Sequence, residues 1–453
     1  MLFSIVMPVY NAETYLNEAI ESILKQSLDF KKNVEIILID NNSDDNSFEI
    51  CNYYLRKYPN NIKVRKIEEP NVSVARNVGI KECSKFSSFI GFIDSDDKIS
   101  KNTLREVYNF FERNIKVNIA VLPIYYFDAR KGSHGLNYRF EDKIHTVNIL
   151  EKYNFVHYHI GGVFVRKSIL DNKKNIFNPN LSFWEDALLI NQILIQEKEY
   201  GLVHKGKYFY RKRKNNNSLV DIAWYKKDRY TNLLQEGYLK LIKVSINEFG
   251  YVIDYVQYLI IYHMKLYFFK KYNNIIYQVL NNSERLEFFS KLYDVLEYID
   301  EKIILEQNFK MYIKEYLITL KRQGIEFDKL INFGEITDEK VIIVKWKFTK
   351  GYYEIFAILS NEYYSTNKND HIFIISRNKK LRIIYERDLK ELKIWNRIVR
   401  ERNNSLVKAK IPIYAFKFSF VLSTNGKNFY INEVNLLNKL LDKVLGKLIF
   451  FKK

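Results

Sequence analysis

Residues 89–97 read Phe-Ile-Gly-Phe-Ile-Asp-Ser-Asp-Asp and pass directly from apolar residues to three carboxylates. The run Phe89–Asp94 has the length and composition of a buried strand. Carboxylates crowded at the end of such a strand repel one another unless a cation neutralises them. A divalent ion that bridges a carboxylate and a diphosphate has this effect and prefers oxygen ligands. Because an Asp-x-Asp triplet also occurs often by chance, its meaning depends on the segments around it.

Strands and helices alternate on both sides of this segment, from residue 1 to about 225. Phe3–Val9 and Val34–Asp40 are short apolar strands, whereas Ala12–Gln26 and Ser47–Tyr58 carry helical patterns. This alternation predicts an α/β fold in which a mostly parallel sheet is covered by helices on both faces. Ligands of such sheets bind beyond the carboxyl ends of the strands. The polar residues that follow each strand are therefore the candidate site.

Three more segments place polar residues at such positions. In Pro8-Val9-Tyr10-Asn11 the ring of Tyr10 could hold a flat base. Asp40 ends the second strand and could accept hydrogen bonds from a base or a ribose, although residues 40–45 could equally form a turn that caps the next helix. Arg76, within residues 71–79, could reach a diphosphate with its planar guanidinium or form an ion pair with a nearby carboxylate.

Together these four segments resemble the inverting family 2 glycosyltransferases of the GT-A fold, over roughly residues 1–220. Members of that family show a Pro-x-Tyr-Asn start, an Asp-Asp-Gly-Ser-like loop, an Ala-Arg-Asn-x-Gly segment and an Asp-x-Asp triplet. This chain departs from the pattern at Asn41 and Asn42, where the family has Asp and Gly. Because Asn tolerates a left-handed backbone, the turn can still form, but the lost carboxylate leaves the identity of the base less defined.

The resemblance implies a donor site for a nucleotide-sugar. Pro8, Tyr10 and Asp40 would contact the nucleoside, and Arg76 would lie near the donor. UDP is the commonest donor nucleotide of the family, so a UDP-sugar is the expected donor, by analogy alone.

A metal ion is implied as well. Asp94 would bind the ribose and share the ion with Asp96, which would hold the metal and the diphosphate. The expected cofactor is Mn²⁺ or Mg²⁺. His204 could complete the metal shell, although a surface or packing histidine explains this residue at least as well.

Residues 183–186, Phe-Trp-Glu-Asp, are similar to the family's Glu-Asp pair, whose Asp deprotonates the acceptor hydroxyl. By this match Asp186 is the catalytic base. Glu185 and Trp184 would lie at the acceptor, where Trp184 could stack on a sugar ring. The alternative is an acidic helix N-terminus, since leucines follow at roughly helical spacing.

The segment that starts at Tyr210 and ends at Ser218 resembles the family's flexible segment that closes over the diphosphate. Its cationic side chains, Arg211 among them, would stabilise a leaving group that gains negative charge. Residues after Gly161-Gly162 would shape the sugar pocket.

The predicted reaction is a single in-line displacement that inverts the anomeric carbon. A surface polymer or lipid-linked glycan, as in capsule, teichoic-acid or lipopolysaccharide assembly, is the expected acceptor. Two alternatives stay open. One is a nucleotidyl or phosphosugar transferase, which usually carries a Gly-rich phosphate loop that this N-terminus lacks. The other is a non-catalytic carbohydrate-binding or polymer-binding protein on the same scaffold.

Residues beyond the GT-A domain, 1–225, have other patterns. A helical region spans 226–335, with aromatic residues at three- and four-residue spacing. A small β-sandwich is predicted over 336–435 as an accessory or assembly domain. Its expected strands are Val341–Phe348, Tyr353–Leu359, His371–Ser376, Leu381–Tyr385, Ile411–Ser419 and Phe429–Val434.

The terminal part, 436–453, is predicted to form a basic amphipathic helix, on the pattern of its last residues, Lys439 to Lys453. It could dock on an anionic membrane surface, or it could pack on its own domain or on another subunit of a homo-oligomer.

Composition narrows the class of protein. The 453 residues contain two cysteines and carry a formal net charge of +19. Neither a disulfide framework nor a metal knuckle fits two cysteines, so a reduced, cytoplasmic location is expected. The basic C-terminal helix adds the expectation of contact at the inner face of the cell membrane. No signal peptide or membrane-spanning run is expected. Because lysine is spread along the whole chain, we expect no nucleic-acid partner, and favour an anionic lipid or polymer.

Overall fold

A computed structural model of the protein describes residues 1–453, except 172–175, 214–221, 270, 328–329, 332–340, 360–370, 378, 382, 386–391, 401–405, 425 and 437–453. The chain divides into two compact units. The first comprises Met1–Met264 and Ile275–Ile303, and the second Lys265–Asn274 and Ile304–Lys453. The helical region predicted over 226–335 thus contributes to both units, and the four-part division by sequence pattern stays a prediction.

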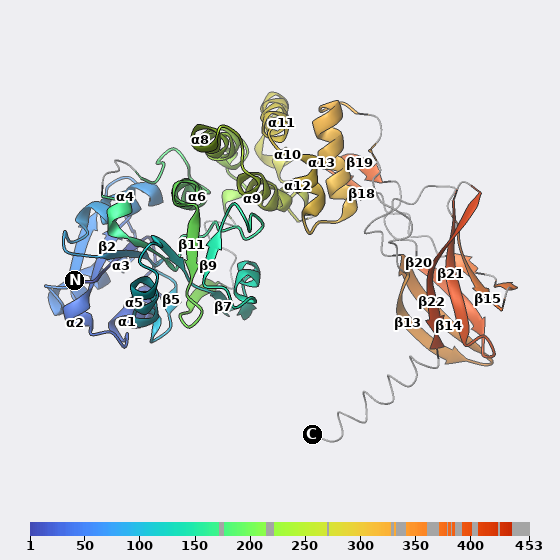
Figure 1. Ribbon diagram of the computed structural model, residues 1–453, viewed down its shortest axis with the longest axis horizontal. Coiled ribbons are helices and arrows are strands. Elements are labelled where there is room, and N and C mark those ends of the chain that lie inside the picture. Colours follow the sequence, from blue (N-terminus) through green and yellow to red (C-terminus); the bar gives the residue numbers. More distant parts are fainter. Residues whose placement is uncertain are drawn as a thin grey trace, which may run out of the picture. The chain divides into compact units, whose positions relative to one another are not determined.

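An eight-stranded sheet forms the centre of the first unit (Figure 1). Its order is β3-β2-β1-β4-β10-β6-β11-β9. β1 pairs in parallel with β2 and β4, and β10 is antiparallel to both of its neighbours. The mostly parallel α/β sheet is therefore confirmed. The strands are β1 (Phe3–Val9), β2 (Val34–Asp40), β3 (Ile62–Lys66), β4 (Phe89–Phe92), β6 (Ile119–Val121), β9 (Thr146–Asn148), β10 (Val163–Arg166) and β11 (Glu199–Leu202).

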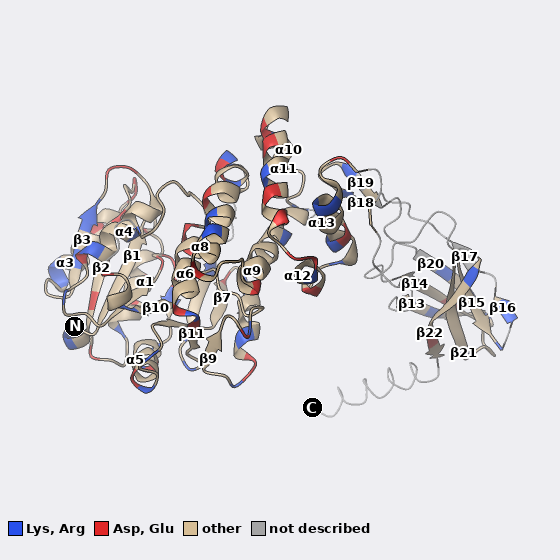
Figure 2. Ribbon diagram, turned by 45° about the horizontal axis from the view of Figure 1, so that its top comes forward, with Lys and Arg blue, Asp and Glu red and all other residues tan. Residues whose placement is uncertain are grey.

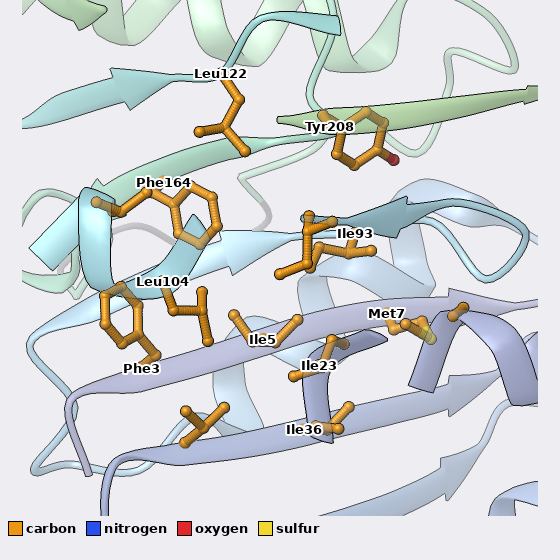
Figure 3. Packing of buried hydrophobic residues seen from close by; sticks show 14 of the residues in the cluster. Phe3, Ile5, Met7, Ile23, Ile36, Ile93, Leu104, Leu122, Phe164 and Tyr208 are labelled. Carbon is orange, nitrogen blue, oxygen red and sulfur yellow. The ribbon is translucent and has the colours of Figure 1, made fainter. Parts of the chain in front are cut away.

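Side chains along each strand point alternately to the two faces of the sheet. Because β1 and β2 are apolar at nearly every position, both faces are apolar and helices cover both. On one face, Figure 3 shows Ile5 of β1 close to Ile23 and Phe3 close to Leu104, within a buried apolar cluster. On the other face, Gly79 lies so near β1 that a Cβ there would sit 2.5 Å from Cγ1 of Val6. The helices are α1 (Leu16–Leu24), α2 (Phe30–Asn33), α3 (Ser47–Lys57), α4 (Val72–Glu82), α5 (Thr103–Arg113) and α6 (Glu185–Glu197).

The helix predicted over Ala12–Gln26 begins later than expected, at Leu16. The amide of Ala12 donates to Oγ of Ser47 at 2.8 Å, and the amide of Glu13 donates to a carboxylate oxygen of Asp45 at 3.0 Å. These contacts hold the residues before α1 against the loop that follows β2. Such long-range contacts are not visible in a helical sequence pattern.

A second sheet of four strands, in the order β5-β12-β7-β8, lies in the same unit. β12 pairs in parallel with β7 and antiparallel with β5. The strands are β5 (Lys98–Ile99), β7 (Ile124–Asp128), β8 (Gly132–Ser133) and β12 (Tyr208–Lys212). Tyr208 and Tyr210 share one face of β12, and Phe209 and Arg211 share the other.

The later helices include a π-helix over Leu233–Leu239, whose cause the contacts do not explain. The capping box of α11 pairs Asn281 with Glu284, as expected for a helix start. The α-helices are α8 (Lys240–Phe249), α9 (Asp254–Met264), α10 (Ile276–Val279), α11 (Asn282–Glu297), α12 (Glu301–Glu306) and α13 (Met311–Gln323). Short 3₁₀ helices span Gly135–Phe140, Lys167–Ile169, Lys227–Arg229 and Lys265–Phe268.

Two antiparallel sheets form the predicted β-sandwich in the second unit, in the orders β13-β14-β20-β17 and β16-β15-β21-β22. Ile355 of the first sheet and Phe420 of the second belong to one buried cluster. The strands, with the hairpin β18–β19, are β13 (Val341–Thr349), β14 (Tyr352–Leu359), β15 (His371–Ser376), β16 (Lys379–Leu381), β17 (Ile383–Tyr385), β18 (Leu392–Ile394), β19 (Arg397–Arg400), β20 (Leu406–Pro412), β21 (Lys417–Thr424) and β22 (Lys427–Asn435).

The strand predicted over Ile411–Ser419 is wrong. β20 ends at Pro412, and the amide of Ala415 donates to the Pro412 carbonyl at 2.9 Å, which closes a turn before β21. The predicted strand Leu381–Tyr385 is also wrong, because β16 and β17 belong to different sheets. The expected terminal helix, 436–453, lies beyond Leu436 and outside the described residues.

None of the described helices combines the length and the apolar character that a membrane span requires. Lys and Arg are scattered in Figure 2, where blue segments occur on α3, α8 and α13 alike. The positive charge is thus not gathered on one of these elements.

Candidate active site

The loops after β1 and β2 are linked through side chains. The amide of Asn11 donates to Oγ of Ser43 at 3.2 Å, and the Asp44 amide donates to Oδ1 of Asn11 at 2.9 Å. Asn11 and Asn42 both have left-handed backbones, with φ of 46° and 60°. Asn42 thus forms the turn expected in place of the family's Gly. Tyr10 is 41% exposed next to these loops, so its ring is accessible to a ligand.

Asp40 is fully buried at the end of β2. Its Oδ2 accepts a hydrogen bond from the Ser43 amide at 3.3 Å, and Nζ of Lys66 lies 4.0 Å away. Its Oδ1 has no hydrogen-bond partner among the described residues. A buried acceptor without a partner is costly, and a base N–H or a ribose hydroxyl would satisfy it. Pro8, in the parallel strand β1, is half-buried and pairs in register with Ile39, the neighbour of Asp40.

Asn41, the second departure from the family pattern, has a structural function. Its Oδ1 accepts a hydrogen bond from the Asn71 amide at 2.7 Å, and Oδ1 of Asn71 accepts from the Val74 amide at 3.1 Å. The first bond ties the loop after β2 to α4, and the second caps that helix. The sequence did not indicate this link.

Arg76 projects from α4 and joins two parts of the site. Its Nη1 donates to Glu185 at 2.7 Å, and its Nη2 donates to Asp94 at 3.1 Å. The arginine is only 6% exposed. Burial would lower its pKa, but the charges of Asp94 and Glu185 outweigh this and raise the pKa, so the guanidinium stays charged. In this structure Arg76 therefore forms the ion pairs that the sequence left open as an alternative.

Asn77, the next residue of the motif, holds the segment that leads to α6. Its Nδ2 donates to the Phe177 carbonyl at 2.9 Å, and the Phe177 amide donates to its Oδ1 at 2.8 Å. Sequence reasoning missed this residue, although an amide can form such a paired contact with a distant backbone. Through Asn77, the Ala-Arg-Asn-x-Gly segment thus holds Phe177, which is 100 positions away in the sequence, next to α4.

Asp97 is buried beside the Asp-x-Asp residues, with 1% exposed. It accepts hydrogen bonds from the hydroxyl of Tyr208 at 2.6 Å and from the Arg211 amide at 2.7 Å. Burial and the charges of Asp96 and Asp94 raise its pKa well above the ordinary value. Asp97 therefore anchors β12 to the loop after β4, and the crowding of negative charge expected from the sequence is present.

Asp96 pairs with Arg213 instead of Arg211. Nε and Nη2 of Arg213 donate to one Asp96 carboxylate oxygen at 3.1 Å and 2.6 Å. Burial raises the pKa of Asp96, although the charge of Arg213 opposes this rise. Arg213 thus pairs directly with a carboxylate of the triplet, a role the sequence did not assign to it individually.

Arg211 contacts several acceptors at once. Its Nε donates to the Asp96 carbonyl at 2.7 Å, its Nη1 donates to Asp128 at 3.1 Å, and its Nη2 donates to Glu18. The side chain is 9% exposed and lies over the ring of Phe127. These contacts make Arg211 a link between α1 and two strands, so a contact with a diphosphate would require it to exchange partners.

Glu185 and Asp186 are the first two residues of α6. Oδ2 of Asp186 accepts from the Ile160 amide at 3.4 Å, and Oδ1 accepts from the Ala187 amide at 2.7 Å. Burial raises the pKa of Asp186. Burial and the adjacent Asp186 charge raise the pKa of Glu185 to about 7, against the opposing charge of Arg76. A carboxylate with a raised pKa is a better proton acceptor than an exposed one.

Trp184 is 3% exposed, with a left-handed backbone at φ of 71°. Its ring packs on Tyr238 and His263. This burial argues against the stacking on a sugar ring that the sequence suggested. His204 contacts the Ile144 carbonyl at 2.6 Å and packs on neighbouring aromatic rings, which supports packing over metal binding. Ser218 lies outside the described residues.

The carboxylates fit a metal ion that is held jointly with a diphosphate. No group of three or more His, Cys, Asp or Glu in the described ranges is arranged to hold an ion by itself. Mg²⁺ at nucleotide sites is commonly bound by one or two carboxylates and by substrate phosphates. Asp96 and Asp94 can supply that number of oxygen ligands. A nearby cation would also lower the pKa of Asp96 and so oppose the effect of burial, which raises it.

Comparisons with known proteins identify the family. The model of "Glycosyl transferase family 2" matches residues 4–172. The chain is 41% identical over 447 residues to the minor teichoic acid biosynthesis protein GgaA of Bacillus subtilis (strain 168), and the match covers 98% of this chain and 100% of GgaA. The chain belongs to glycosyl transferase family 2. This family 2 chain is thus a glycosyltransferase, as the sequence predicted.

Two further similarities extend the comparison. The family 2 chain is 35% identical over 330 residues to the minor teichoic acid biosynthesis protein GgaB of the same strain. This match covers 73% of this chain and 36% of GgaB. It also resembles the crystal structure of S. aureus TarS 1-349 in complex with UDP-GlcNAc, with a TM-score of 0.55 and 19% identity, over 72% of this chain and 88% of that one. At this identity the likeness to TarS shows the fold alone.

Proposed function

We propose that this glycosyltransferase moves a sugar from a UDP-sugar to a hydroxyl of a teichoic-acid polymer. Its similarity to GgaA, which extends over 98% of this chain, supports the polymer class. The donor class is supported by the unsatisfied Oδ1 of Asp40 and the exposed ring of Tyr10, beside the first two strand ends. A nucleotide-sugar donor places the reaction in the cytoplasm, and a lipid-linked polymer would bring it to the inner face of the membrane.

The observation that carries this proposal is the buried Arg76 bridge. By contacting Asp94 and Glu185 together, Arg76 holds the Asp-x-Asp segment next to the acidic start of α6. A donor at Asp94 and Asp96 and an acceptor at Asp186 would then lie on the two sides of one site. Such positioning is a requirement for an in-line displacement.

In the proposed mechanism Asp186 accepts the proton of the acceptor hydroxyl as this oxygen attacks the anomeric carbon. The bond from that carbon to the diphosphate oxygen breaks, and UDP leaves with the electron pair. One attack from the opposite face inverts the anomeric centre. Asp96 and Asp94 would hold a divalent ion, which when bound would neutralise negative charge on the leaving group. Arg213, which lies on Asp96 in this structure, would add a second positive charge nearby.

Calorimetric titration with UDP, with and without Mn²⁺, tests the donor site. We expect wild type to bind UDP in a metal-dependent manner and Asp96→Ala to lose this dependence. Asp294→Ala, which removes an exposed carboxylate of α11, is the matched control and should bind as wild type does. Failure of wild type to bind under either condition would remove UDP as the donor, and CDP and GDP would be titrated next.

Analysis of the reaction products distinguishes sugar transfer from nucleotidyl transfer and from non-catalytic binding. Release of UDP together with an inverted linkage supports the proposed transfer, whereas release of pyrophosphate indicates a nucleotidyl transferase. A product that retains the configuration of the donor would exclude a single displacement. Binding of the polymer without turnover of any nucleotide-sugar would indicate a non-catalytic binding protein.

A further inference from the structure

One face of the second sheet carries side chains that the proposed chemistry does not use. Alternation along β12 places Tyr208, Tyr210 and Lys212 together, and the parallel register puts Tyr126 of β7 beside Tyr210. The opposite face carries Phe209 and the buried Arg211. The two faces of β12 therefore differ, and only one of them includes Tyr208, whose hydroxyl donates to Asp97.

Rings and cations form a continuous cluster on this face, which we call the aromatic strip. Tyr126 lies 5.9 Å from Tyr210 and 5.2 Å from His134, and His159 lies 5.3 Å from Tyr210, as centroid distances. All four residues are half-buried, so each keeps an accessible part. The members of the strip are Tyr126, Arg130, His134, His159, Tyr210 and Lys212.

The two histidines offer complementary hydrogen-bonding groups. Nδ1 of His134 accepts from the Leu136 amide at 3.1 Å, which leaves Nε2 as the donor of the neutral ring. Nδ1 of His159 lies 3.1 Å from the Gly161 carbonyl and so donates, which leaves Nε2 as an acceptor. The rings are 6.4 Å apart. A donor and an acceptor at this separation suit ligands with several hydroxyl groups.

Positive charge surrounds these rings. The guanidinium of Arg130 lies 4.2 Å from the centroid of Tyr126, and Nζ of Lys212 lies 4.7 Å from that of Tyr210. Arg130 is exposed and makes no ion pair with any described carboxylate. Burial lowers the pKa of His134 to about 3, and His159 and nearby arginine and lysine charges contribute to this effect. Burial also lowers the pKa of His159. The strip is thus positively charged while its histidines are neutral.

The strip reaches the carboxylates of the candidate site. His159 packs on Tyr208 at 5.8 Å, and the hydroxyl of Tyr208 contacts Asp97 and the Asp94 amide. Gly161 allows this approach, because a Cβ there would lie 2.4 Å from the Tyr208 hydroxyl. The strip also reaches the proposed base, because the amide of Ile160, the residue after His159, donates to Oδ2 of Asp186 at 3.4 Å. A chain bound along the strip would therefore end beside Asp94 and Asp186.

We propose that the aromatic strip binds a polyol-phosphate segment of the acceptor polymer. This inference rests on the proposed function, since it assumes a polymer acceptor. Phosphates would contact Arg130 and Lys212, and polyol hydroxyls would contact the two histidines. Aromatic rings would cover the apolar edges of the polyol or of its sugars. The strip would thus select an anionic polymer over a neutral glycan and direct its hydroxyls toward Asp186.

Binding of a short synthetic poly(glycerol phosphate) to the full chain tests this inference. Arg130→Glu should weaken binding roughly tenfold or more, because one exposed contact changes from attraction to repulsion. The matched control is Lys207→Glu, which reverses an exposed lysine next to Tyr125, on the other face of the sheet. The control should bind within about twofold of wild type. Added salt should weaken wild-type binding, and a neutral dextran of similar length should not bind.

The outcomes separate this inference from the proposed function. Equal loss of binding in Arg130→Glu and Lys207→Glu would show that charge anywhere on the sheet suffices and would overturn the strip as the site. Unchanged binding by Arg130→Glu would overturn it as well, while the polymer acceptor would stand. If wild type binds UDP but not the polymer, the proposed acceptor class fails and the strip fails with it. If it binds the polymer but not UDP, the strip stands and the donor assignment falls.

Discussion

Glu185 in the first unit and Glu354 in the β-sandwich show opposite shifts of pKa. Burial next to Asp186 raises the pKa of Glu185, whereas a hydrogen bond with Lys347 lowers that of Glu354. Glu354 lies on β14, directly across the strand pair from Lys347. The sandwich thus pairs its charges across neighbouring strands. The first unit instead places carboxylates together at the ends of strands and the start of a helix.

The different placement of charges in the two regions follows from the topology of their sheets. Parallel strands all end at the same edge of a sheet, so the residues that follow β1, β2 and β4 meet there. Antiparallel strands alternate in direction, and opposite charges on adjacent strands can face each other along the ladder. Crowded carboxylates cost stability and are expected where they bind ions or transfer protons. Four predictions test whether the two regions differ in this way.

The largest expected effect is on turnover. Asp186→Asn removes the proposed base and should lower the rate of transfer about 10³-fold, within the range of general-base catalysis. UDP affinity should stay within about twofold, because Asp186 is assigned to the acceptor. Initial rates with a UDP-sugar and calorimetry measure the two effects. Glu354→Gln is the matched control in the sandwich and should leave the rate unchanged. Full activity of Asp186→Asn would remove the assignment of this residue as base.

Removal of Arg76 should destabilise the first unit. Arg76→Ala leaves Asp94 and Glu185 without their buried partner, which costs about 3–5 kcal/mol in comparable proteins. Urea unfolding, followed by tryptophan fluorescence, measures this change. Lys347→Ala breaks a cross-strand pair of the sandwich and should cost no more than about 1 kcal/mol. Similar losses in both variants would contradict the difference between the regions.

A cavity in the sandwich should affect stability without affecting the donor site. Ile355→Ala removes a fully buried side chain from the sandwich core and should cost about 2–5 kcal/mol. UDP binding should be retained at temperatures where the variant is folded, since the core of the sandwich and the candidate site belong to different units. Scanning calorimetry and UDP titration report the two properties. Loss of UDP binding in a folded variant would show that the units are coupled.

The pH dependence of stability should differ in sign between the two glutamates. Glu185 has a folded pKa of about 7, above the ordinary value of 4.5, so the folded state binds the extra proton and its stability falls as pH rises between these values. Glu354 has a lowered pKa, so its contribution is lost as pH falls. Unfolding of Glu185→Gln is compared with wild type above pH 4.5 and that of Glu354→Gln below pH 4.5, and the two differences should have opposite slopes. Parallel slopes would remove the predicted contrast.

Much of the first unit could be predicted from local patterns. The runs Phe3–Val9 and Val34–Asp40 coincide with β1 and β2, because a fully buried strand must be apolar on both faces. The position of the Asp-x-Asp triplet after β4 was likewise visible in the sequence. The end of β20 at Pro412 was not, since a turn inside an apolar run leaves no periodicity to detect.

Among the site residues, too, some could be predicted from the sequence and others could not. Asp94, Asp96 and Asp186 were identifiable because carboxylates at strand ends and helix starts are unusual by type and by position. Their partners were not, because ion pairs over long separations depend on how the elements pack. Trp184 shows the same limit, since only its surroundings reveal that it is buried against Tyr238.

By itself, the sequence determined the alternation of strands and helices, the family and the residues able to do chemistry, since each follows from residue type and local spacing. The tertiary structure decided which charges meet. Arg76 contacts Glu185, 109 positions away, Arg213 contacts Asp96, and the two faces of β12 acquire different surroundings. These contacts depend on sheet order and helix packing, where small differences in free energy between alternative partners are not encoded in any local pattern.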